Sequence, residues 1–256
     1  MNPTATELFE QWLPVLAELD TTLLLYGEDG VGADELAAAV HTLGRRRHGR
    51  LVTVDCGTLT AERFAPVMLG VRSRRLPSLH PHGRGALAEA QGGTLLLSGV
   101  DTLAPEVQPR LRRVLEDGAF TPAGADHPVG LDVRVISTSA TDLTREMQGG
   151  AFRADLFYRL AVFPVRIPPL RERPDDVAGL AQHLVQEIAR ETGRPAPTLS
   201  RGALTALSGY RWPGNVRELT AVLVRAVLRA DGQRIDRIDG LPGDPSPAPG
   251  ARGGYT

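Results

Sequence analysis

One stretch near the start of the chain, Leu23 to His41, sets strong limits on the fold. It reads LLLYGEDGVGADELAAAVH, which is a short apolar run, a glycine-rich turn and a helical pattern. A strand, then G-x-x-x-x-G, then a helix aims backbone N–H groups and the positive end of the helix dipole at a phosphate group. The stretch therefore predicts an α/β fold with a phosphate-loop-like turn. On this motif alone, a glycine turn that only links strand to helix stays equally open.

The turn departs from a complete phosphate loop at two positions. The full pattern adds Lys, which reaches the outer phosphates, and Ser or Thr, which holds magnesium. Ala33 and Asp34 stand there instead. Ala33 brings no charge, and Asp34 would repel a triphosphate unless magnesium lay between them. The candidate nucleotide-binding residues, in degenerate form, are Gly27, Glu28, Asp29, Gly30, Val31, Gly32, Ala33 and Asp34.

Strand-length and helical patterns alternate as far as about residue 170. The apolar or β-branched runs are TTLLLYG, RLVTVDCG, GTLLLSGV and DVRVISTS, and helical patterns such as DELAAAVHTL and EVQPRLRRVLEDG follow or separate them. Such alternation predicts a parallel sheet with helices on both faces. We therefore expect an α/β domain over residues 1–170, which starts with a helix that includes Leu8 and Phe9.

The character of the sequence changes after residue 170. The remaining patterns, VAGLAQHLVQEIARETG, RGALTALSGY and NVRELTAVLVRAVLRADG, are all helical. We expect a small all-helical lid domain over residues 171–240, with Trp212 in its core. Residues 241–256 are rich in proline and glycine, which predicts a disordered tail.

Composition excludes several classes of protein. A formal net charge of -1 gives no global attraction to nucleic acid or to acidic membranes. No apolar run approaches the roughly 20 residues of a membrane span, and the N-terminus lacks a secretion signal, so we expect a cytoplasmic protein with no membrane contact.

The single cysteine, Cys56, is expected to be a buried thiol. His80 and His82 form an H-x-H pair without an evident third ligand, so no metal site is expected.

Five longer motifs carry a resemblance to a known family. They are GGTLLL (92–97), VLEDGAF (114–120), DVRVISTSATDL (132–143), FRADLFYRLAVFPVRIPPLRERPDD (152–176) and YRWPGNVREL (210–219). With them the chain resembles the AAA+ domain of sigma-54-dependent transcription activators, the bacterial enhancer-binding proteins, over about residues 7 to 240. The resemblance implies an AAA+ P-loop NTPase-type sheet with a helical lid, assembly into oligomers and a role in transcription regulation.

The chain departs from this family where the chemistry would occur. The family's phosphate loop resembles GESGTGKE, and here it reads GEDGVGAD. The family's magnesium strand resembles GGTLFLDE, whereas here GGTLLL is followed by Ser98 and Gly99. By the resemblance, the missing Asp would organise magnesium and the missing Glu would activate water. Asp55 and Ala140 also replace two asparagines of the family, one thought to relay the nucleotide state and one acting as a sensor. We expect no catalytic residues and no bound metal.

A family loop with the consensus GAFTGA, which touches the sigma factor, is also replaced. Its position is filled by RRLPSL, Arg74 to Leu79. We therefore expect no nucleotide-dependent contact with sigma-54.

Three arginines of the family pattern survive. Arg153 and Arg159, in FRADLFYRL, match the positions of arginine fingers offered to a neighbouring subunit, and Arg217, in GNVREL, matches the second sensor arginine on the lid. Ordinary ion pairs within the chain are the alternative role for all three.

These observations favour a pseudo-ATPase. We expect a non-hydrolysing regulatory or scaffold subunit in transcription control, which contacts copies of itself or an intact AAA+ paralogue in a ring, and we expect no DNA-binding domain in this sequence. No cofactor is certain, and binding of ATP or ADP without turnover stays open. The alternative is an active or nucleotide-binding ATPase that remodels sigma-54 RNA polymerase.

Overall fold

The computed structural model describes residues 12–71, 84–230, 234–239 and 241. The chain divides into two compact units, Met1–Pro168 and Pro169–Thr256. Several of the features expected from the sequence lie outside the described residues: Leu8 and Phe9 of the first helix, the loop position Arg74–Leu79, the pair His80 and His82, and the tail beyond Leu241. Among the helices of the described part of the chain, none combines the length and apolarity needed to cross a bilayer.

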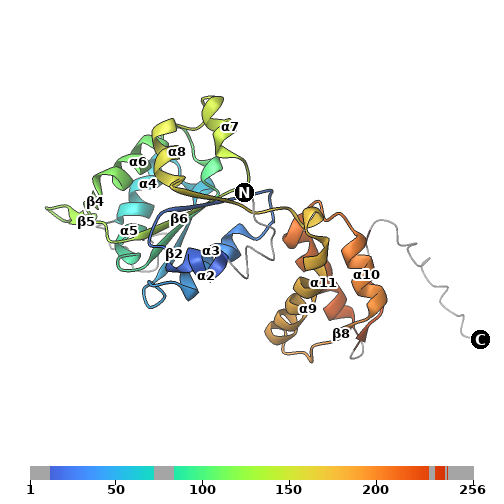
Figure 1. Ribbon diagram of the computed structural model, residues 1–256. Coiled ribbons are helices and arrows are strands. Elements are labelled where there is room, and N and C mark those ends of the chain that lie inside the picture. Colours follow the sequence, from blue (N-terminus) through green and yellow to red (C-terminus); the bar gives the residue numbers. More distant parts are fainter. Residues whose placement is uncertain (1–11, 72–83, 231–233, 240, 242–256) are drawn as a thin grey trace, which may run out of the picture. The chain divides into compact units, whose positions relative to one another are not determined.

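The first unit is built on a five-stranded parallel sheet with the strand order β2-β3-β6-β1-β7 (Figure 1). The strands are β1 (Leu23–Tyr26), β2 (Leu51–Asp55), β3 (Thr94–Ser98), β6 (Arg134–Ser139) and β7 (Phe163–Arg166). All neighbouring pairs are parallel, which confirms the predicted fold class. Because parallel strands end at the same edge of a sheet, the segments that follow β1, β2, β3 and β6 meet there.

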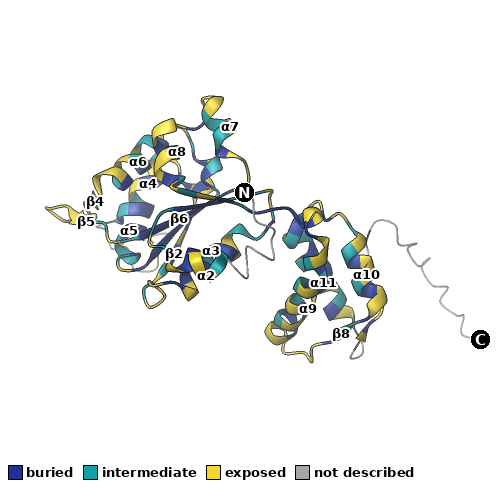
Figure 2. Cartoon of the chain, viewed as in Figure 1, coloured by how far each residue is buried: buried dark blue, intermediate teal, exposed yellow. Residues whose placement is uncertain are grey.

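Helices cover both faces of this sheet. They are α2 (Leu13–Glu18), α3 (Ala33–Leu43), α4 (Ala61–Phe64), α5 (Ala86–Glu89), α6 (Gln108–Asp117), α7 (Leu143–Gln148) and α8 (Ala154–Leu160), and a small hairpin joins β4 (Ala119–Phe120) to β5 (Val129–Gly130). Successive side chains of β1 point to opposite faces of the sheet. Leu23 and Leu25 pack in the core with α2 and α3, and Leu24 packs in the core on the other face, with α4 to α8. Figure 2 shows the strands as the buried centre between these layers.

The second unit is a bundle of three helices. They are α9 (Pro174–Glu191), α10 (Arg201–Gly209) and α11 (Asn215–Arg229), and a short parallel pair, β8 (Thr198–Leu199) with β9 (Arg234–Ile235), was not predicted. Trp212 is completely buried in the core, as expected, and its ring N–H donates to the carbonyl oxygen of Leu207 at 2.8 Å. A buried indole N–H without a partner would be costly, so this bond fixes where the ring sits.

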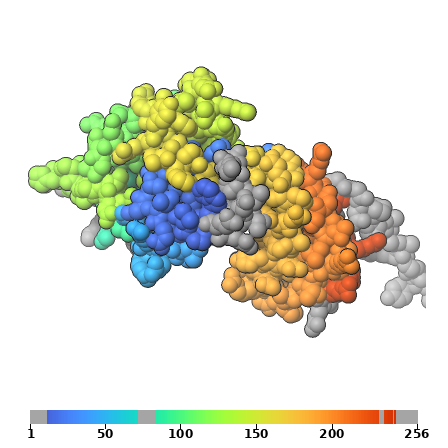
Figure 3. All heavy atoms as spheres, in the orientation of Figure 1, coloured from blue at the N-terminus to red at the C-terminus, as the bar shows by residue number. Residues whose placement is uncertain are grey.

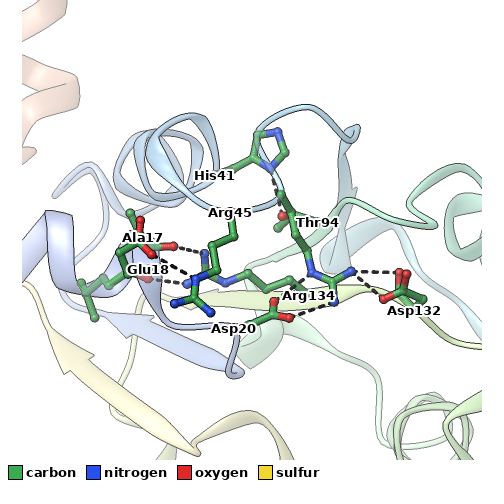
Figure 4. A network of polar contacts seen from close by, with 10 residues as sticks. Ala17, Glu18, Asp20, His41, Arg45, Thr94, Asp132 and Arg134 are labelled. Atoms are coloured by element: carbon green, nitrogen blue, oxygen red, sulfur yellow. Dashed lines mark hydrogen bonds and ion pairs between the residues drawn. The ribbon is translucent and has the colours of Figure 1, made fainter.

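A buried arginine ties α2 to the first unit at the edge of the sheet where β6 begins (Figure 4). The Arg134 guanidinium donates to the carbonyl oxygens of Leu16 at 2.5 Å and of Ala17 at 3.3 Å, which the end of α2 leaves without partners inside the helix. Burial lowers the pKa of Arg134, and burial together with the Arg134 charge lowers the pKa of His41 nearby. The first residue of β6, Arg134, therefore holds the end of α2 in place.

Candidate functional site

The glycine turn between β1 and α3 has the backbone shape that the sequence suggests. Gly30 and Gly32 have φ values of 75° and 95°, which favour glycine. A Cβ atom at Gly27 would lie 2.6 Å from the carbonyl oxygen of Ile167, so a larger residue would force a shift. Gly32 precedes the first residue of α3, Ala33, and the loop leads directly into the positive end of this helix.

A carboxylate at the start of α3 joins three parts of the sheet edge. Asp34 Oδ2 accepts a hydrogen bond from the Ser98 hydroxyl at 2.6 Å, and Asp34 Oδ1 accepts one from the Thr138 hydroxyl at 2.7 Å. The Thr138 oxygen in turn accepts from the backbone N–H of Gly99 at 3.1 Å. We call Asp34, Ser98, Thr138 and the Gly99 N–H the carboxylate bridge. It fastens α3 to the ends of β3 and β6.

The donor set at this edge does not fit a magnesium–phosphate group. Magnesium prefers octahedral oxygen ligands, usually one or two carboxylates with phosphate oxygens and waters. Here a hydroxyl, that of Ser98, stands where the resemblance expects a carboxylate, and both oxygens of Asp34 already accept hydrogen bonds. Within the described residues, no group of three or more His, Cys, Asp or Glu side chains is placed to hold a metal ion. Ala33 adds no positive charge to compensate.

Gly99, at the position of the missing base, has a backbone conformation that favours glycine. Gly99 has φ 67° and ψ 51°, the left-handed conformation. A Cβ atom there would meet nothing closer than the Thr102 hydroxyl at 3.6 Å, so space does not exclude a side chain. The conformation does disfavour one, by about 1–2 kcal/mol for an L-residue. A glutamate at this position would therefore strain the backbone that the carboxylate bridge uses.

The other replaced positions serve local turns. Asp55 accepts from the backbone N–H of Gly57 at 2.9 Å, and the backbone N–H of Ala140 donates to the Asp101 carboxylate at 3.2 Å. Cys56 is fully buried, which confirms the expected buried thiol, and burial followed by the nearby negative charges of Asp55 and Asp101 raises its pKa. The thiolate form needed for nucleophilic attack is therefore disfavoured.

The two arginine-finger candidates lie at the ends of α8, whose atoms (yellow) form part of the outer surface of the first unit in Figure 3. Arg153 donates to both carboxylate oxygens of Asp155, at 3.0 and 2.8 Å, and its side chain is half exposed. Arg159 donates twice to the carbonyl oxygen of Leu115, at 3.0 and 2.6 Å. Arg153 therefore makes the intrachain ion pair of the alternative role, with a partly exposed partner, whereas Arg159 bonds a backbone carbonyl oxygen and not a carboxylate.

Arg217 lies apart from these residues along the chain. It is in the first turn of α11, in the second unit, so the first unit taken alone does not bring it to the glycine turn.

Thr138 and Asp101 are the site residues that sequence reasoning missed. Thr138 is only 4% exposed, and it lies within STSATDL, a polar run at the end of an otherwise apolar strand. Polar residues at the carboxyl end of a buried parallel strand were the available signal, because ligand sites in such sheets form at that edge.

Comparison with known proteins gives consistent matches along the chain. Residues 2–166 match the model of the sigma-54 interaction domain, and residues 171–246 match that of the AAA+ ATPase lid domain. The nitrogen fixation protein AnfA of Azotobacter vinelandii is 39% identical over 84% of this chain and 40% of its own length. The DNA-binding transcriptional regulator NtrC of Azospirillum brasilense is 36% identical over 93% of this chain and 49% of its own length. The chain thus spans less than half of each relative.

Solved structures agree with these matches. The crystal structure of NtrX from Brucella abortus in complex with ADP has a TM-score of 0.79 and 32% sequence identity, and it covers 94% of this chain and 54% of NtrX. The structure of the same protein in complex with ATP has a TM-score of 0.77.

The carboxylate bridge predicts the effect of one substitution. Thr138→Val keeps the shape of the side chain but leaves the Gly99 N–H and one Asp34 oxygen without their partner. We expect the free energy of unfolding to fall by about 1–3 kcal/mol, measured by urea denaturation. Thr53→Val, on an exposed position of β2, is the matched control and should change stability little. Equal effects of the two substitutions would show that the bridge does not stabilise the unit.

Proposed function

The chain belongs to the family of sigma-54 interaction domains, and from this premise we propose that it is a non-hydrolysing AAA+ subunit that regulates transcription through protein–protein contacts. The observation that carries the proposal is the carboxylate bridge: a serine hydroxyl replaces the metal carboxylate, and the nearest carboxylate, Asp34, is bonded to protein hydroxyls instead.

The energetic argument concerns the charges that phosphoryl transfer requires. Catalysis of this reaction is almost entirely positioning and electrostatic stabilisation of the transferred group. Ala33 removes the cation at the loop, Ser98 removes the metal carboxylate, and Gly99 removes the general base. Removal of a single preorganised stabilising group costs about 3–4 kcal/mol in other enzymes, so three losses together leave little catalysis.

Nucleotide binding without turnover fits within the same proposal. The glycine turn keeps the backbone shape that presents N–H groups to a phosphate, and NtrX, a structural relative, was crystallised with ADP and with ATP. Two negative side chains, Asp34 and Glu35, occupy the first turn of α3. They would oppose a triphosphate, so any affinity would come from the backbone and from the nucleoside.

The surface around α8 supports a role toward a neighbouring subunit. In the proposed mixed ring, an intact family member supplies the loop and carboxylates, and this chain supplies an arginine. Arg153 suits this better than Arg159, because its exposed pairing with Asp155 can be exchanged for a phosphate at little cost, whereas Arg159 supports the end of α6. Tyr158 on α8, which is 68% exposed, and Val162 just after this helix, which is 56% exposed, add apolar surface to this region.

The alternative, a working ATPase that remodels sigma-54 RNA polymerase, rests on overall similarity to activators such as NtrC. This alternative requires residues elsewhere in the chain to replace the missing lysine and both missing carboxylates.

The first functional prediction is that the purified chain hydrolyses ATP no faster than a buffer control. Phosphate release is measured with magnesium at several protein concentrations. Turnover that rises with protein concentration would contradict the proposal, and its loss in Arg153→Ala would show a functioning arginine finger as well as a functioning site.

The second functional prediction concerns the proposed ring. An intact family member whose own arginine fingers are changed to Ala is mixed with this chain, and ATP turnover is measured. Arginine fingers contribute about 10³–10⁵-fold in related systems, so the wild-type chain should restore turnover and Arg153→Ala should restore at least about tenfold less. Arg113→Ala, an exposed arginine of α6 with a 79% exposed side chain, is the control and should rescue fully. Absence of co-assembly at micromolar concentrations, or equal rescue by Arg153→Ala, would refute this role.

A further inference from the structure

A hollow in the second unit lies between the end of α11 and the segment that follows it. Its volume is about 300 Å³. The lining residues are Arg225, Ala226, Arg229, Ala230, Arg234, Ile235, Asp236, Arg237 and Asp239. We call this hollow the arginine pocket. None of its residues belongs to the glycine turn, the carboxylate bridge or the three family arginines, so it is independent of the proposed function.

The pocket carries an excess of positive charge. Four guanidinium groups face two carboxylates, which leaves a formal charge of two positive. Arg234 pairs with Asp236 at 2.8 Å and Arg229 with Asp239 at 3.6 Å. Arg225 and Arg237 form no ion pair with any residue that the structure describes. Two cations are thus available to an anion from outside.

The paired arginines are also available at low cost. All four side chains of the two pairs are more than half exposed, between 59% and 69%. Exposed ion pairs contribute little to stability because water and salt screen them. A ligand anion can therefore replace the carboxylate partner of Arg229 or Arg234.

Helix electrostatics explains only part of this cluster. Cations near the end of a helix are favoured by its dipole, which accounts for Arg229 in the last turn of α11 but not for Arg225 one turn earlier. These two residues are four positions apart, a spacing at which like charges destabilise a helix. Arg234 and Arg237 follow the helix on a separate segment, and the dipole effect falls off within the last turn. The convergence of both segments on one hollow needs another explanation.

We propose that the arginine pocket binds a phosphate monoester. A phosphate monoester carries a charge of about −1.5 to −2 at neutral pH, which matches the excess of the pocket. A carboxylate, or a phosphodiester of nucleic acid, carries only one negative charge. The planar guanidinium fork binds phosphate oxygens in pairs. The volume lies at the lower end of the range of about 300–1,000 Å³ for small-molecule sites, so it admits the phosphate and a short attached group.

A phosphate monoester occurs in two kinds of ligand: a free phosphorylated metabolite and a phosphorylated side chain of a protein. The probes are O-phosphoserine and a short peptide that contains phosphoserine, each titrated calorimetrically into the full chain at low salt. Both probes lack a nucleoside, but the glycine turn also presents N–H groups to phosphate, so variants of the pocket are needed to locate the binding. Binding of the free amino acid as tightly as the peptide indicates a metabolite, and tighter binding of the peptide indicates a phosphoprotein. Either result supports the pocket.

Variants then locate the binding. Arg225→Ala with Arg237→Ala should weaken phosphoserine binding at least tenfold. The matched control, Arg201→Ala with Arg211→Ala, removes two exposed arginines of the same unit from outside the pocket and should leave affinity unchanged. Asp236→Asn with Asp239→Asn should strengthen binding severalfold, and this gain does not depend on a truncated side chain. Thermal unfolding of each variant checks that it is folded.

Four outcomes would overturn the proposal. They are no measurable binding of either probe, equal loss of affinity in the control variant, equal affinity for unphosphorylated peptide, and tighter binding of single-stranded DNA than of phosphoserine.

Discussion

The Asp34 carboxylate is the constraint on which the candidate site depends. It stands in the first turn of α3, where the helix dipole favours a negative charge, and the hydroxyls of Ser98 and Thr138 both donate to it. Through these bonds, one exposed side chain links the glycine turn to the ends of β3 and β6. At the sheet edge where the family resemblance expects metal and phosphate, this chain therefore has hydrogen bonds between its own side chains. Gly99, which has the left-handed conformation, donates its N–H to Thr138 in the same network.

The chain keeps the scaffold of its family but not the residues for its chemistry. The five-stranded sheet, the glycine turn and the helical second unit are retained, together with the sequence motifs that define the family. Among the described residues, the replaced positions Ala33, Ser98 and Gly99 lie at one edge of the sheet. The Ser98 hydroxyl can donate to the neighbouring Asp34, which a second carboxylate at that position would repel. The role that we propose for this chain, protein–protein contacts without ATP turnover, uses this retained scaffold.

The sequence predicted the fold well because its signals are local. The apolar run of strand length at Leu23 to Leu25 and the helical repeat after residue 170 can be recognised within short windows. The site was only partly predictable, because its decisive contacts join distant residues. Thr138 is 104 positions from Asp34, and Arg134 is 118 positions from Leu16. Neither the backbone conformation of Gly99 nor the contact of Arg159 with Leu115 has a local sequence signal. The pair β8 and β9 was missed because each strand has only two residues.

Magnesium dependence of nucleotide affinity tests the central claim most directly. ATP and ADP are titrated calorimetrically into the full chain, with magnesium and with a chelator. A site that organises a metal binds ATP more tightly when magnesium is present, since the ion neutralises the outer phosphates. The carboxylate bridge predicts that magnesium changes the affinity for either nucleotide by less than about twofold, or that neither binds. A tenfold or greater gain for ATP in magnesium, about 1.4 kcal/mol, would show that Asp34 is free to serve a metal and would contradict the account.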